Sequence, residues 1–434
     1  MRAWGVIEGF YGRPWSAAER LELFEWLAAA GLDAYLHAPK DDLRHRARWR
    51  EPYPTDELAA LRELVAAAQA RGVAFWYGLA PGLDLRHADP DDRRALLAKL
   101  GQLRAIGVDG LALLFDDIPP RLDPADRARF GTLAAAQADV AREVAAALPG
   151  PLLLCPTEYC GVMSRGLASE YLAELGRLLP PEVDVLWTGP DIVSLELTVE
   201  HVRQVAAVLG RKPVVWDNLF ANDYDMRRLH LGPFAGRPLE LRDEVRGLFL
   251  NPNCEHEANA VAVHTLGAWR RAQGAWDPRA AHEAALRAWL PRWDGAGVSL
   301  DELRLLCDAL HLPGGPGPTA REWLGHLERL ATLPPARWGE SEPAFLEAAG
   351  RLFALSDRLP SLSRRPLFHA LLRHAWELKQ ELHILRGWVA WKKAHPDGEP
   401  FFHPHARPPI YKGALLTRLR AVLAMAPDGG LRPA

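Results

Sequence analysis

The sequence has few cysteines, no excess of basic residues and no long apolar run. It has four cysteines (Cys155, Cys160, Cys254 and Cys307) and no C-x-x-C pair, which argues against a disulfide-stapled secreted fold and a structural zinc site. Basic residues number 52 and acidic residues 55, so the net charge of −3 lacks the basic excess typical of nucleic-acid binding. No apolar run approaches the roughly 18 residues that cross a membrane.

A targeting segment is also missing from the first residues. MRAWGVIEGF shows no basic stretch followed by an apolar run and a small-residue cleavage site. We therefore expect a cytoplasmic protein with reduced cysteines and with neither a membrane nor a nucleic acid as partner. Apolar residues make up 49% and charged residues 25%, a composition typical of a chain with a sizeable core.

Short apolar runs alternate with longer helical stretches over the first part of the chain, a pattern typical of βα units. The predicted strands are Trp4–Glu8, Ala34–His37, Ala74–Gly78, Gly110–Phe115, Leu152–Cys155, Val183–Trp187, Val214–Trp216 and Leu248–Leu250. The predicted helices are Ala17–Ala30, Thr55–Arg71, Pro90–Ile106, Ala125–Leu148, Ser169–Leu179, Val199–Leu209, Leu239–Arg246 and Glu257–Arg271. Eight such units predict a (β/α)8 TIM barrel over residues 1–276. The alternative, a doubly wound open sheet, is disfavoured because the first βα turn lacks G-x-G-x-x-G.

After Asp277 the pattern changes to apolar residues spaced three and four apart, without strand-like alternation. The predicted helices are Ala280–Leu290, Leu300–Leu312, Thr319–Thr332, Phe345–Ser356, Phe368–Lys393 and Gly413–Leu423. We therefore predict an all-α helical domain over residues 277–434. Its tryptophans are interpreted as packing residues rather than sugar-stacking platforms; they are Trp289, Trp293, Trp323, Trp338, Trp376, Trp388 and Trp391.

The predicted strand ends are unusually polar and aromatic. In a barrel of this kind the catalytic residues lie where the strands run into the βα loops. The segments at these points are EGFYGRPW, HAPKDD, PGLD, FDDIPP, CPTEYC, WTGP, WDNLFANDYD and NPNCEHEAN. This recurrence indicates a ligand site more strongly than any one segment does.

Adjacent carboxylates follow the fourth predicted strand, at Asp116 and Asp117. Successive side chains of an extended backbone point to opposite sides, but at a strand end both can border one pocket. Two carboxyls in one pocket favour a state in which one is ionised and the other protonated, as acid/base catalysis requires. The alternative is that both cap the turn before Pro119-Pro120. A metal site is disfavoured because no histidine joins the pair and no HxH or HExxH spacing occurs nearby.

A second group of side chains, after the second, seventh and eighth predicted strands, suits a sugar ligand. Its members are Lys40, Asp41, Asp42, Trp216, Asp217, Asn218, Asn222, Asp223, Tyr224, Asp225, Asn251 and Asn253. Amides, carboxylates and a lysine beside aromatic rings can bind hydroxyls and pack on the C–H face of a sugar ring. A phosphate would require more cationic residues and a glycine-rich loop. Alternatives stay open for single residues: Trp216 suits a barrel core as well as a sugar wall, Tyr159 is equally ambiguous, and Lys40 suits an exposed loop. The asparagines of these loops could equally satisfy turn backbone.

Seven motifs along the barrel half resemble one known family. They are GVIEGFYGRPW (Gly5–Trp15), APKDD (Ala38–Asp42), LLFDDI (Leu113–Ile118), CPTEYCG (Cys155–Gly161), LWTGP (Leu186–Pro190), WDNLFANDYD (Trp216–Asp225) and NPNCEHEANAVAVHTL (Asn251–Leu266). Together they resemble glycoside hydrolase family 84, the family of O-GlcNAcases and bacterial β-N-acetylglucosaminidases. Residues 277–434 carry no motif of that family.

The resemblance implies hydrolysis of terminal β-linked N-acetylglucosamine, including from serine and threonine, with retention of configuration. In that mechanism the 2-acetamido oxygen of the substrate attacks the anomeric carbon, and water opens the resulting oxazoline. By match to the motif, Asp116 holds the acetamido N–H and Asp117 is the general acid and then the base. The partner implied is a glycoconjugate or glycoprotein that bears N-acetylglucosamine. Neither a metal nor an organic cofactor is implied.

The resemblance also assigns binding roles, residue by residue. Lys40 and the backbone of Gly9 line the sugar site, Asp223 and Asn253 hold hydroxyls, Tyr159 and Asn218 contact the acetamido group, and Trp216 walls its pocket. Alternative functions are hydrolysis of another N-acetylhexosaminide, endo-acting hyaluronan hydrolysis and, more remotely, a non-catalytic carbohydrate-binding barrel. The presence of both Asp116 and Asp117 argues against the last. The sequence gives no indication of oligomeric state.

Overall fold

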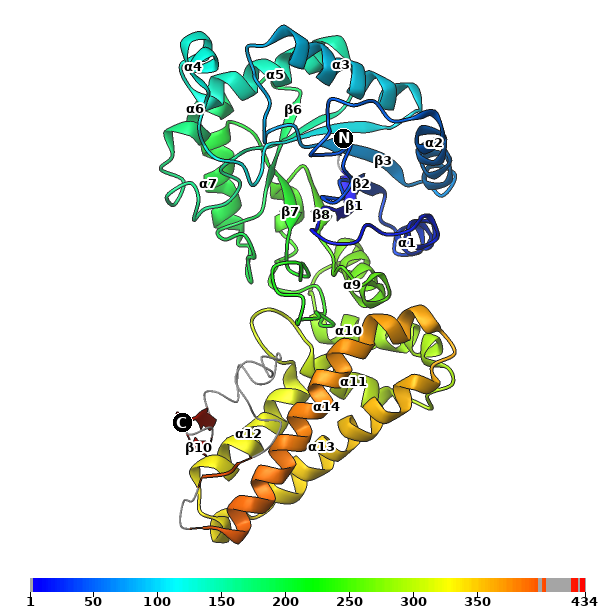
Figure 1. The fold of residues 1–434 in the computed structure, drawn as a ribbon, viewed down its shortest axis with the longest axis vertical. Helices are drawn as coiled ribbons and strands as arrows, with labels where there is room; N and C mark the ends of the chain where they lie inside the picture. The colour runs from blue at the N-terminus through cyan, green and yellow to red at the C-terminus, as the bar shows by residue number, and fades with distance from the viewer. Residues whose placement is uncertain (1–2, 397–399, 403–422, 428–429, 434) are drawn as a thin grey trace. The chain divides into compact units, whose positions relative to one another are not determined.

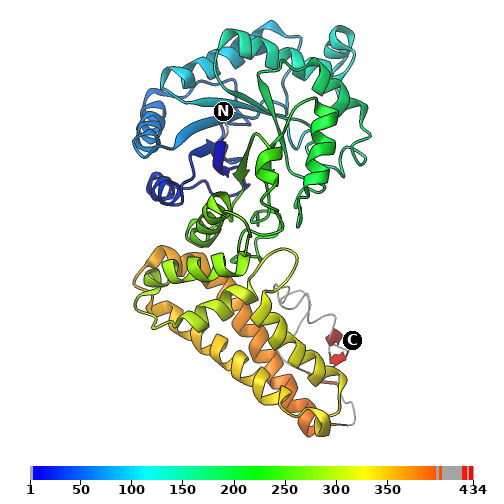
Figure 2. The same ribbon diagram turned by 180° about the vertical axis from the view of Figure 1, so that it is seen from behind.

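The computed structural model describes residues 3–396, 400–402, 423–427 and 430–433. Eight strands form a closed, all-parallel barrel in chain order, and helices surround them (Figure 1 and Figure 2). The strands are β1 (Ala3–Glu8), β2 (Ala34–His37), β3 (Ala74–Leu79), β4 (Gly110–Leu114), β5 (Leu152–Cys155), β6 (Val183–Trp187), β7 (Val214–Asp217) and β8 (Gly247–Leu250). The barrel closes because β1 pairs with β8, with Val6 opposite Leu250. The predicted fold class is confirmed.

Alternate strand residues fill the barrel interior. Ile7, Leu36, Trp76, Leu114 and Phe249 belong to one buried cluster, and the rings of Trp76 and Phe249 lie 6.1 Å apart. The intervening residues face the surrounding helices, which makes both strand faces apolar. Residues that bind or react with a ligand are therefore expected in the loops that follow the strands.

Helices alternate with the eight barrel strands, and the chain after the barrel is mainly helical. Those of the barrel half are α1 (Ala17–Ala29), α2 (Thr55–Gln69), α3 (Pro90–Ala105), α4 (Pro124–Phe130), α5 (Leu133–Ala147), α6 (Glu170–Leu178), α7 (Val199–Leu209), α8 (Leu241–Glu244) and α9 (Asn259–Arg271). Ser16 caps α1 in a capping box with Glu19, and Asp89 caps α3 ahead of Pro90, as their positions predict. Helix α2 begins at Thr55, behind Pro54, which supplies no side-chain cap.

The single helix predicted over Ala125–Leu148 is wrong, because two helices, α4 and α5, occupy this stretch. Gly131 ends α4 at a φ of 76°, a conformation in which glycine lacks the usual steric cost. The Thr132 side chain then accepts a hydrogen bond from the Ala135 amide and starts α5. The apolar periodicity continues across this break, which is why the pattern alone suggested one helix.

The chain divides into two compact units. The first comprises residues 1–223, 234–254 and 263–278, and the second comprises residues 224–233, 255–262 and 279–434. The predicted boundary between residues 276 and 277 stays a prediction. No described helix has the length and apolar character of a membrane span.

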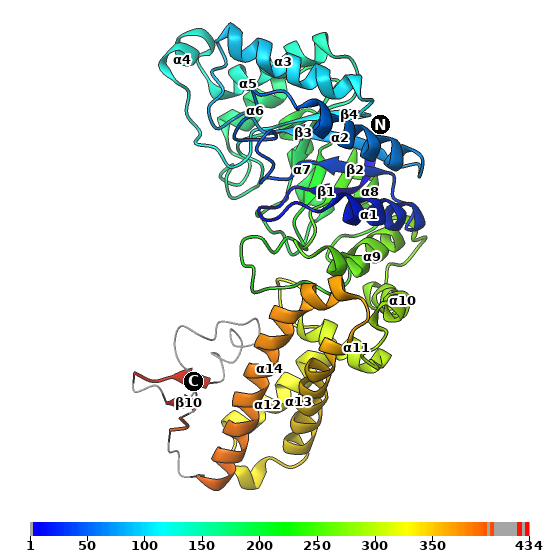
Figure 3. The ribbon, with the colours of Figure 1, turned by 45° about the vertical axis from the view of Figure 1, so that its right-hand side comes forward.

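The second unit is mainly helical. Its helices are α10 (Pro278–Trp289), α11 (Leu300–Ala309), α12 (Pro318–Thr332), α13 (Ser341–Arg358) and α14 (Arg365–Ala394). Helix α13 packs against both α12 and α14, and the long helices of this unit run side by side (Figure 3). Trp289, Trp293, Trp323, Trp338 and Trp388 lie in its buried core and Trp391 packs partly against it. The packing interpretation thus holds for all of these, whereas Trp376 is 56% exposed.

Two short strands, β9 (Leu423–Met425) and β10 (Leu431–Pro433), pair antiparallel near the end of the chain. The residue pattern does not predict them, because a three-residue strand is too short to show alternation. The helix predicted over Gly413–Leu423 lies outside the described residues except for Leu423.

Candidate active site

The two adjacent aspartates follow β4 at the carboxyl end of the barrel. Asp116 is 5% exposed, whereas Asp117 is exposed and has a φ of 54°. This left-handed conformation costs a residue with a side chain about 1–2 kcal/mol, although aspartate tolerates it better than most. It also breaks the alternation of extended backbone, so consecutive side chains need not point to opposite faces.

Asp116 forms a buried ion pair with the lysine that follows β2. The Lys40 ammonium lies 2.5 Å from Asp116 Oδ2, and the two side chains are 1% and 6% exposed. The other carboxylate oxygen, Asp116 Oδ1, is buried without a hydrogen-bond partner among the described residues. A buried acceptor left open in this way requires a partner from outside the chain or a water.

Asp117 is held by two tyrosines. Tyr159 donates its hydroxyl to Asp117 Oδ1 at 2.8 Å, and Tyr11 donates its hydroxyl to Oδ2 at 2.9 Å. Burial, followed by the Asp117 carboxylate, raises the pKa of both phenols well above the ordinary value, so both remain protonated donors. The Asp116 carboxylate raises the same two pKa values, so both aspartates act on this pair of phenols.

Trp216 lies between the Lys40 ammonium and the barrel core. It is 5% exposed and belongs to the interior cluster, yet its ring centroid lies 5.4 Å from the Lys40 ammonium. Gly9 packs directly on it, since a Cβ at Gly9 would lie 2.7 Å from Trp216 Cζ2. The geometry therefore fits both sequence interpretations of Trp216, as core and as wall.

The remaining predicted residues lie on the loops after β7 and β8. Asn218 donates to the Ile192 carbonyl at 2.8 Å and accepts from Asn251 at 2.9 Å. Asp223 is half-buried and its Oδ2 accepts the backbone N–H of Tyr11 at 2.9 Å. Asn253 is fully buried. The loop after β1 is thus tied to the loop after β7 at the residue that also contacts Asp117.

Asp217 lies between Trp216 and Asn218 in the sequence. Unlike them, it forms a buried ion pair with Arg237. Its carboxylate accepts two hydrogen bonds from Arg237, at 2.8 and 2.7 Å, and both side chains are fully buried. Arg237 also donates to the carbonyls of Ser194 and Leu195, at 2.7 Å each. Asp217 Oδ1 also accepts the Leu219 amide at 3.1 Å. Asp217 therefore pairs with the buried arginine that holds the loop after β6, which is a structural role.

Sequence reasoning missed two residues that contact Asp117. Tyr11 lies inside the first strand-end motif, so its place three residues after β1 was a usable signal. Arg46 donates from Nη2 to the Asp117 carbonyl oxygen at 3.1 Å. Nothing in the sequence marks Arg46, because it lies nine residues beyond β2 among other arginines.

The donor set at the aspartates suits an organic ligand. An ammonium balances Asp116 and two phenols solvate Asp117, whereas a metal site would gather further carboxylates, imidazoles or thiolates around them. The expected absence of a metal or organic cofactor stays a prediction.

Comparison with known proteins agrees with this geometry. The family model described as beta-N-acetylglucosaminidase matches residues 4–303, which include every candidate site residue. The chain belongs to this family. The resemblance to glycoside hydrolase family 84 is therefore confirmed.

The share of each relative's length that aligns with this chain differs between members of the family. Protein O-GlcNAcase of Rattus norvegicus and that of Mus musculus are each 46% identical over 269 residues, 61% of this chain and 29% of each relative. The chain thus spans less than a third of the length of these curated relatives. The structure of a point mutant of O-GlcNAc hydrolase from Thermobaculum terrenum is 30% identical, with a TM-score of 0.79. The match covers 90% of this chain and 84% of the Thermobaculum terrenum chain, so the likeness extends past Leu266, where the motifs end.

Proposed function

We propose that the chain is a retaining β-N-acetylglucosaminidase that removes terminal β-linked N-acetylglucosamine, including from serine and threonine, by substrate-assisted catalysis. One observation carries the proposal: Asp116, buried and paired with Lys40, keeps an open acceptor at Oδ1, directly before an aspartate held by two phenols. An acetamido N–H is the donor that such an acceptor would take.

In the first step, the acetamido oxygen forms a bond to the anomeric carbon while the glycosidic C–O bond breaks. Asp117 gives its proton to the leaving oxygen, and Asp116 accepts the N–H and stabilises the positive charge that develops on the amide. The product of this step is an oxazoline protonated on nitrogen, whose N–H stays hydrogen-bonded to Asp116, so no side chain needs to reach the anomeric carbon. Lys40 fixes the Asp116 carboxylate during this charge development.

In the second step, the Asp117 carboxylate takes a proton from water as the water oxygen attacks the anomeric carbon. The oxazoline C–O bond breaks, and the acetamide re-forms with its N–H on Asp116. Because two attacks occur, on opposite faces of the anomeric carbon, configuration is retained. The hydroxyls of Tyr11 and Tyr159 donate to the two carboxyl oxygens of Asp117 and so orient this side chain for the step.

The other residues are assigned to binding. We infer that Gly9 and Lys40 line the sugar site and that Asp223 and Asn253 hold its hydroxyls. Tyr159 and Asn218 contact the acetamido group, and Trp216 closes its pocket. The glycine is required there because a side chain at residue 9 would displace the Trp216 ring.

The proposal includes the kind of substrate. The rat and mouse relatives are named protein O-GlcNAcases, which supports a glycoprotein or other glycoconjugate bearing N-acetylglucosamine as the substrate here. A cytoplasmic location and the lack of a nucleic-acid partner stay predictions.

Comparing two aryl glycosides tests the function. We expect the aryl N-acetyl-β-glucosaminide to be cleaved at least about 10³-fold faster than the aryl β-glucoside with the same phenol, because only the former carries the internal nucleophile. The shared phenol keeps the leaving group constant. Comparable rates would contradict substrate assistance, whereas binding of the sugar without turnover would favour the non-catalytic barrel.

A hydroxyl-binding role makes a separate prediction for Asp223. Asp223→Ala should lower kcat/KM by about 10²-fold, equivalent to about 2–3 kcal/mol of lost charge-assisted hydrogen bonding, with little change in melting temperature. The matched control is Asp184→Ala: Asp184 lies near the start of β6, at the opposite barrel end, and pairs with Arg246. If Asp223→Ala unfolded the protein while its folded fraction kept full activity, the residue would be structural.

A further inference from the structure

The general acid proposed above is held at its backbone as well as its side chain. Arg46 Nη2 donates to the Asp117 carbonyl oxygen at 3.1 Å. The same guanidinium lies 5.7 Å from the ring centroid of Tyr11, whose hydroxyl donates to Asp117 Oδ2. Arg46 thus touches one end of Asp117 directly and reaches the other end through Tyr11.

Arg46 itself sits on a strongly anchored stretch of chain, residues 41–54 between β2 and α2. His45, the residue before it, bonds through Nδ1 to the Gly78 carbonyl at 2.7 Å, and its backbone carbonyl accepts from the Ala80 amide at 2.9 Å. Burial lowers the pKa of His45 to about 3, so the ring is neutral and Nδ1–H is the donor. These bonds fix the backbone next to Arg46 on the end of β3.

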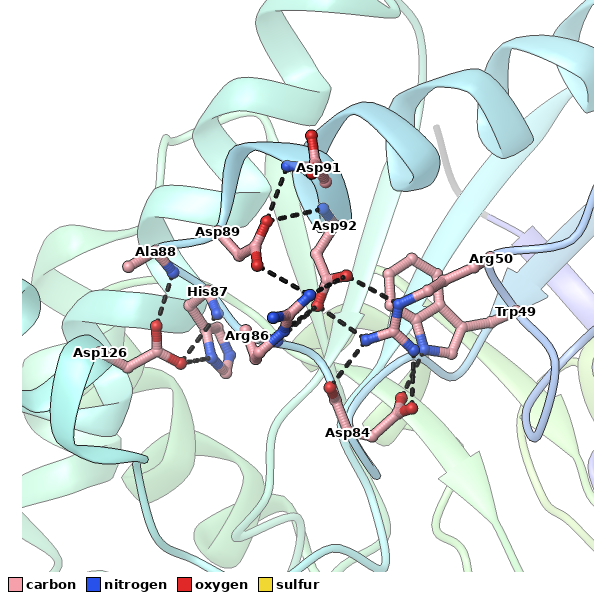
Figure 4. A network of polar contacts seen from close by, with 10 residues as sticks. All are labelled: Trp49, Arg50, Asp84, Arg86, His87, Ala88, Asp89, Asp91, Asp92 and Asp126. Atoms are coloured by element: carbon pink, nitrogen blue, oxygen red, sulfur yellow. Dashed lines mark hydrogen bonds and ion pairs between the residues drawn. The ribbon is translucent and has the colours of Figure 1, made fainter.

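The far side of the same stretch is tied to the loop after β3 (Figure 4). Trp49 donates from Nε1 to Asp84 at 2.8 Å, and Arg50 binds Asp92 through two hydrogen bonds of 2.7 Å. Arg50 also donates to Asp84 Oδ2 at 2.6 Å. Residues 41–54 are therefore anchored on both sides of Arg46, which makes that side chain a rigid support.

The conformation of Asp117 explains why a support is needed there. A residue with a side chain and a φ of 54° keeps this backbone only where its surroundings over-determine it. Arg46 is 9% exposed and its second terminal nitrogen, Nη1, has no partner in the described part of the chain, so the contact with Asp117 is its one hydrogen bond there. A buried cation placed in this way contributes little to the local fold except through Asp117 and Tyr11.

We propose that Arg46 is a positioning residue for Asp117: it holds the left-handed peptide and the Tyr11 ring so that the acid faces the glycosidic oxygen. This rests on the proposed function, because it takes Asp117 as the general acid. Without Arg46 the Asp117 backbone can leave its left-handed conformation. Proton transfer from Asp117 to the glycosidic oxygen is then impaired more than sugar binding is. The defect is therefore largest where the leaving group depends on a proton.

The experiment measures kcat/KM against leaving-group pKa for a series of aryl N-acetyl-β-glucosaminides. Arg46→Met should lose about 10–100-fold on the poorest leaving groups and less than about threefold on the most activated ones. Arg46→Lys, which restores a cationic donor, should recover part of the lost rate on the poor leaving groups and so bring the slope back toward that of the parent chain. Arg48→Met is the matched control, since Arg48 lies on the same stretch with its side chain 57% exposed, and should match the parent chain.

Asp117→Asn in the same series separates the possible results. A steep slope for Asp117→Asn with a uniform loss for Arg46→Met would overturn the positioning role while leaving the proposed function intact. A flat slope for Asp117→Asn would overturn the role of Asp117 and this inference with it. If Arg46→Met does not fold, Arg46→Lys decides: a slope between those of the parent and Asp117→Asn supports the role, and a parental slope with a reduced rate contradicts it.

Discussion

Asp117→Asn should reduce cleavage of poor leaving groups by about 10²–10⁴-fold while slowing the most activated aryl glycosides much less. Bond breaking needs a proton only when the departing oxygen is basic. Asparagine can accept one of the two hydrogen bonds from Tyr11 and Tyr159 through its carbonyl oxygen, and its amide nitrogen can donate to the other phenol oxygen. Asparagine also tolerates the left-handed backbone. The fold should therefore survive, and melting temperature checks this.

Two further readouts belong to this variant. Azide needs no general base, so adding it should restore the ring-opening step and yield the β-glycosyl azide. The pH profile should lose its basic limb, because that limb reports the protonated acid and asparagine has no such proton. A variant that slowed all leaving groups equally and ignored azide would rule out Asp117 as the acid.

Asp116→Asn should behave differently, with a loss of about 10²–10³-fold that is the same for every leaving group. The charge that Asp116 stabilises develops on the acetamido nitrogen whichever phenol departs, and azide supplies no substitute for it. A slope as steep as that of Asp117→Asn would contradict the assignment of roles to the two aspartates.

Stability requires a control in this case. Asp116→Asn leaves the Lys40 ammonium, whose side chain is 1% exposed, without its anion. An unpaired buried charge costs about 3–5 kcal/mol of folding free energy. The double variant Asp116→Asn with Lys40→Met removes both charges, so it should regain melting temperature while staying inactive. Recovered activity in the double variant would show that the loss came from folding alone.

The barrel was predictable because its signal is local and repeated. Each strand is a short apolar run followed by a polar turn, and the observed bounds differ from the predicted ones by a residue or two, as for β4. The break between α4 and α5 was hidden because apolar spacing persists across Gly131 and Thr132. A single glycine carries less weight in a pattern than the fifteen residues of α5.

The residue types of the candidate site could be predicted from the sequence, but the hydrogen bonds and ion pairs among them could not. Lys40 and Asp116 are 76 residues apart, and only the adjacency of β2 to β3 and of β3 to β4 brings them to one pocket. The same limit explains Asp217, which looks like its neighbours in sequence yet is neutralised by Arg237. Arg46 and the backbone of Asp117 were beyond reach, because a positive φ leaves no trace in residue types when the residue is not glycine.

The left-handed peptide at residue 117 also constrains how this protein could change over generations. Single-nucleotide changes from an aspartate codon include asparagine and glycine, the two residues that accept such a backbone most readily. Glutamate, which would keep an acid, adds a longer side chain to a conformation that it adopts poorly. The most accessible neighbours in sequence space at this position are therefore folded but inactive. We expect loss of catalysis here to leave an intact barrel behind, available for a role in recognising sugars.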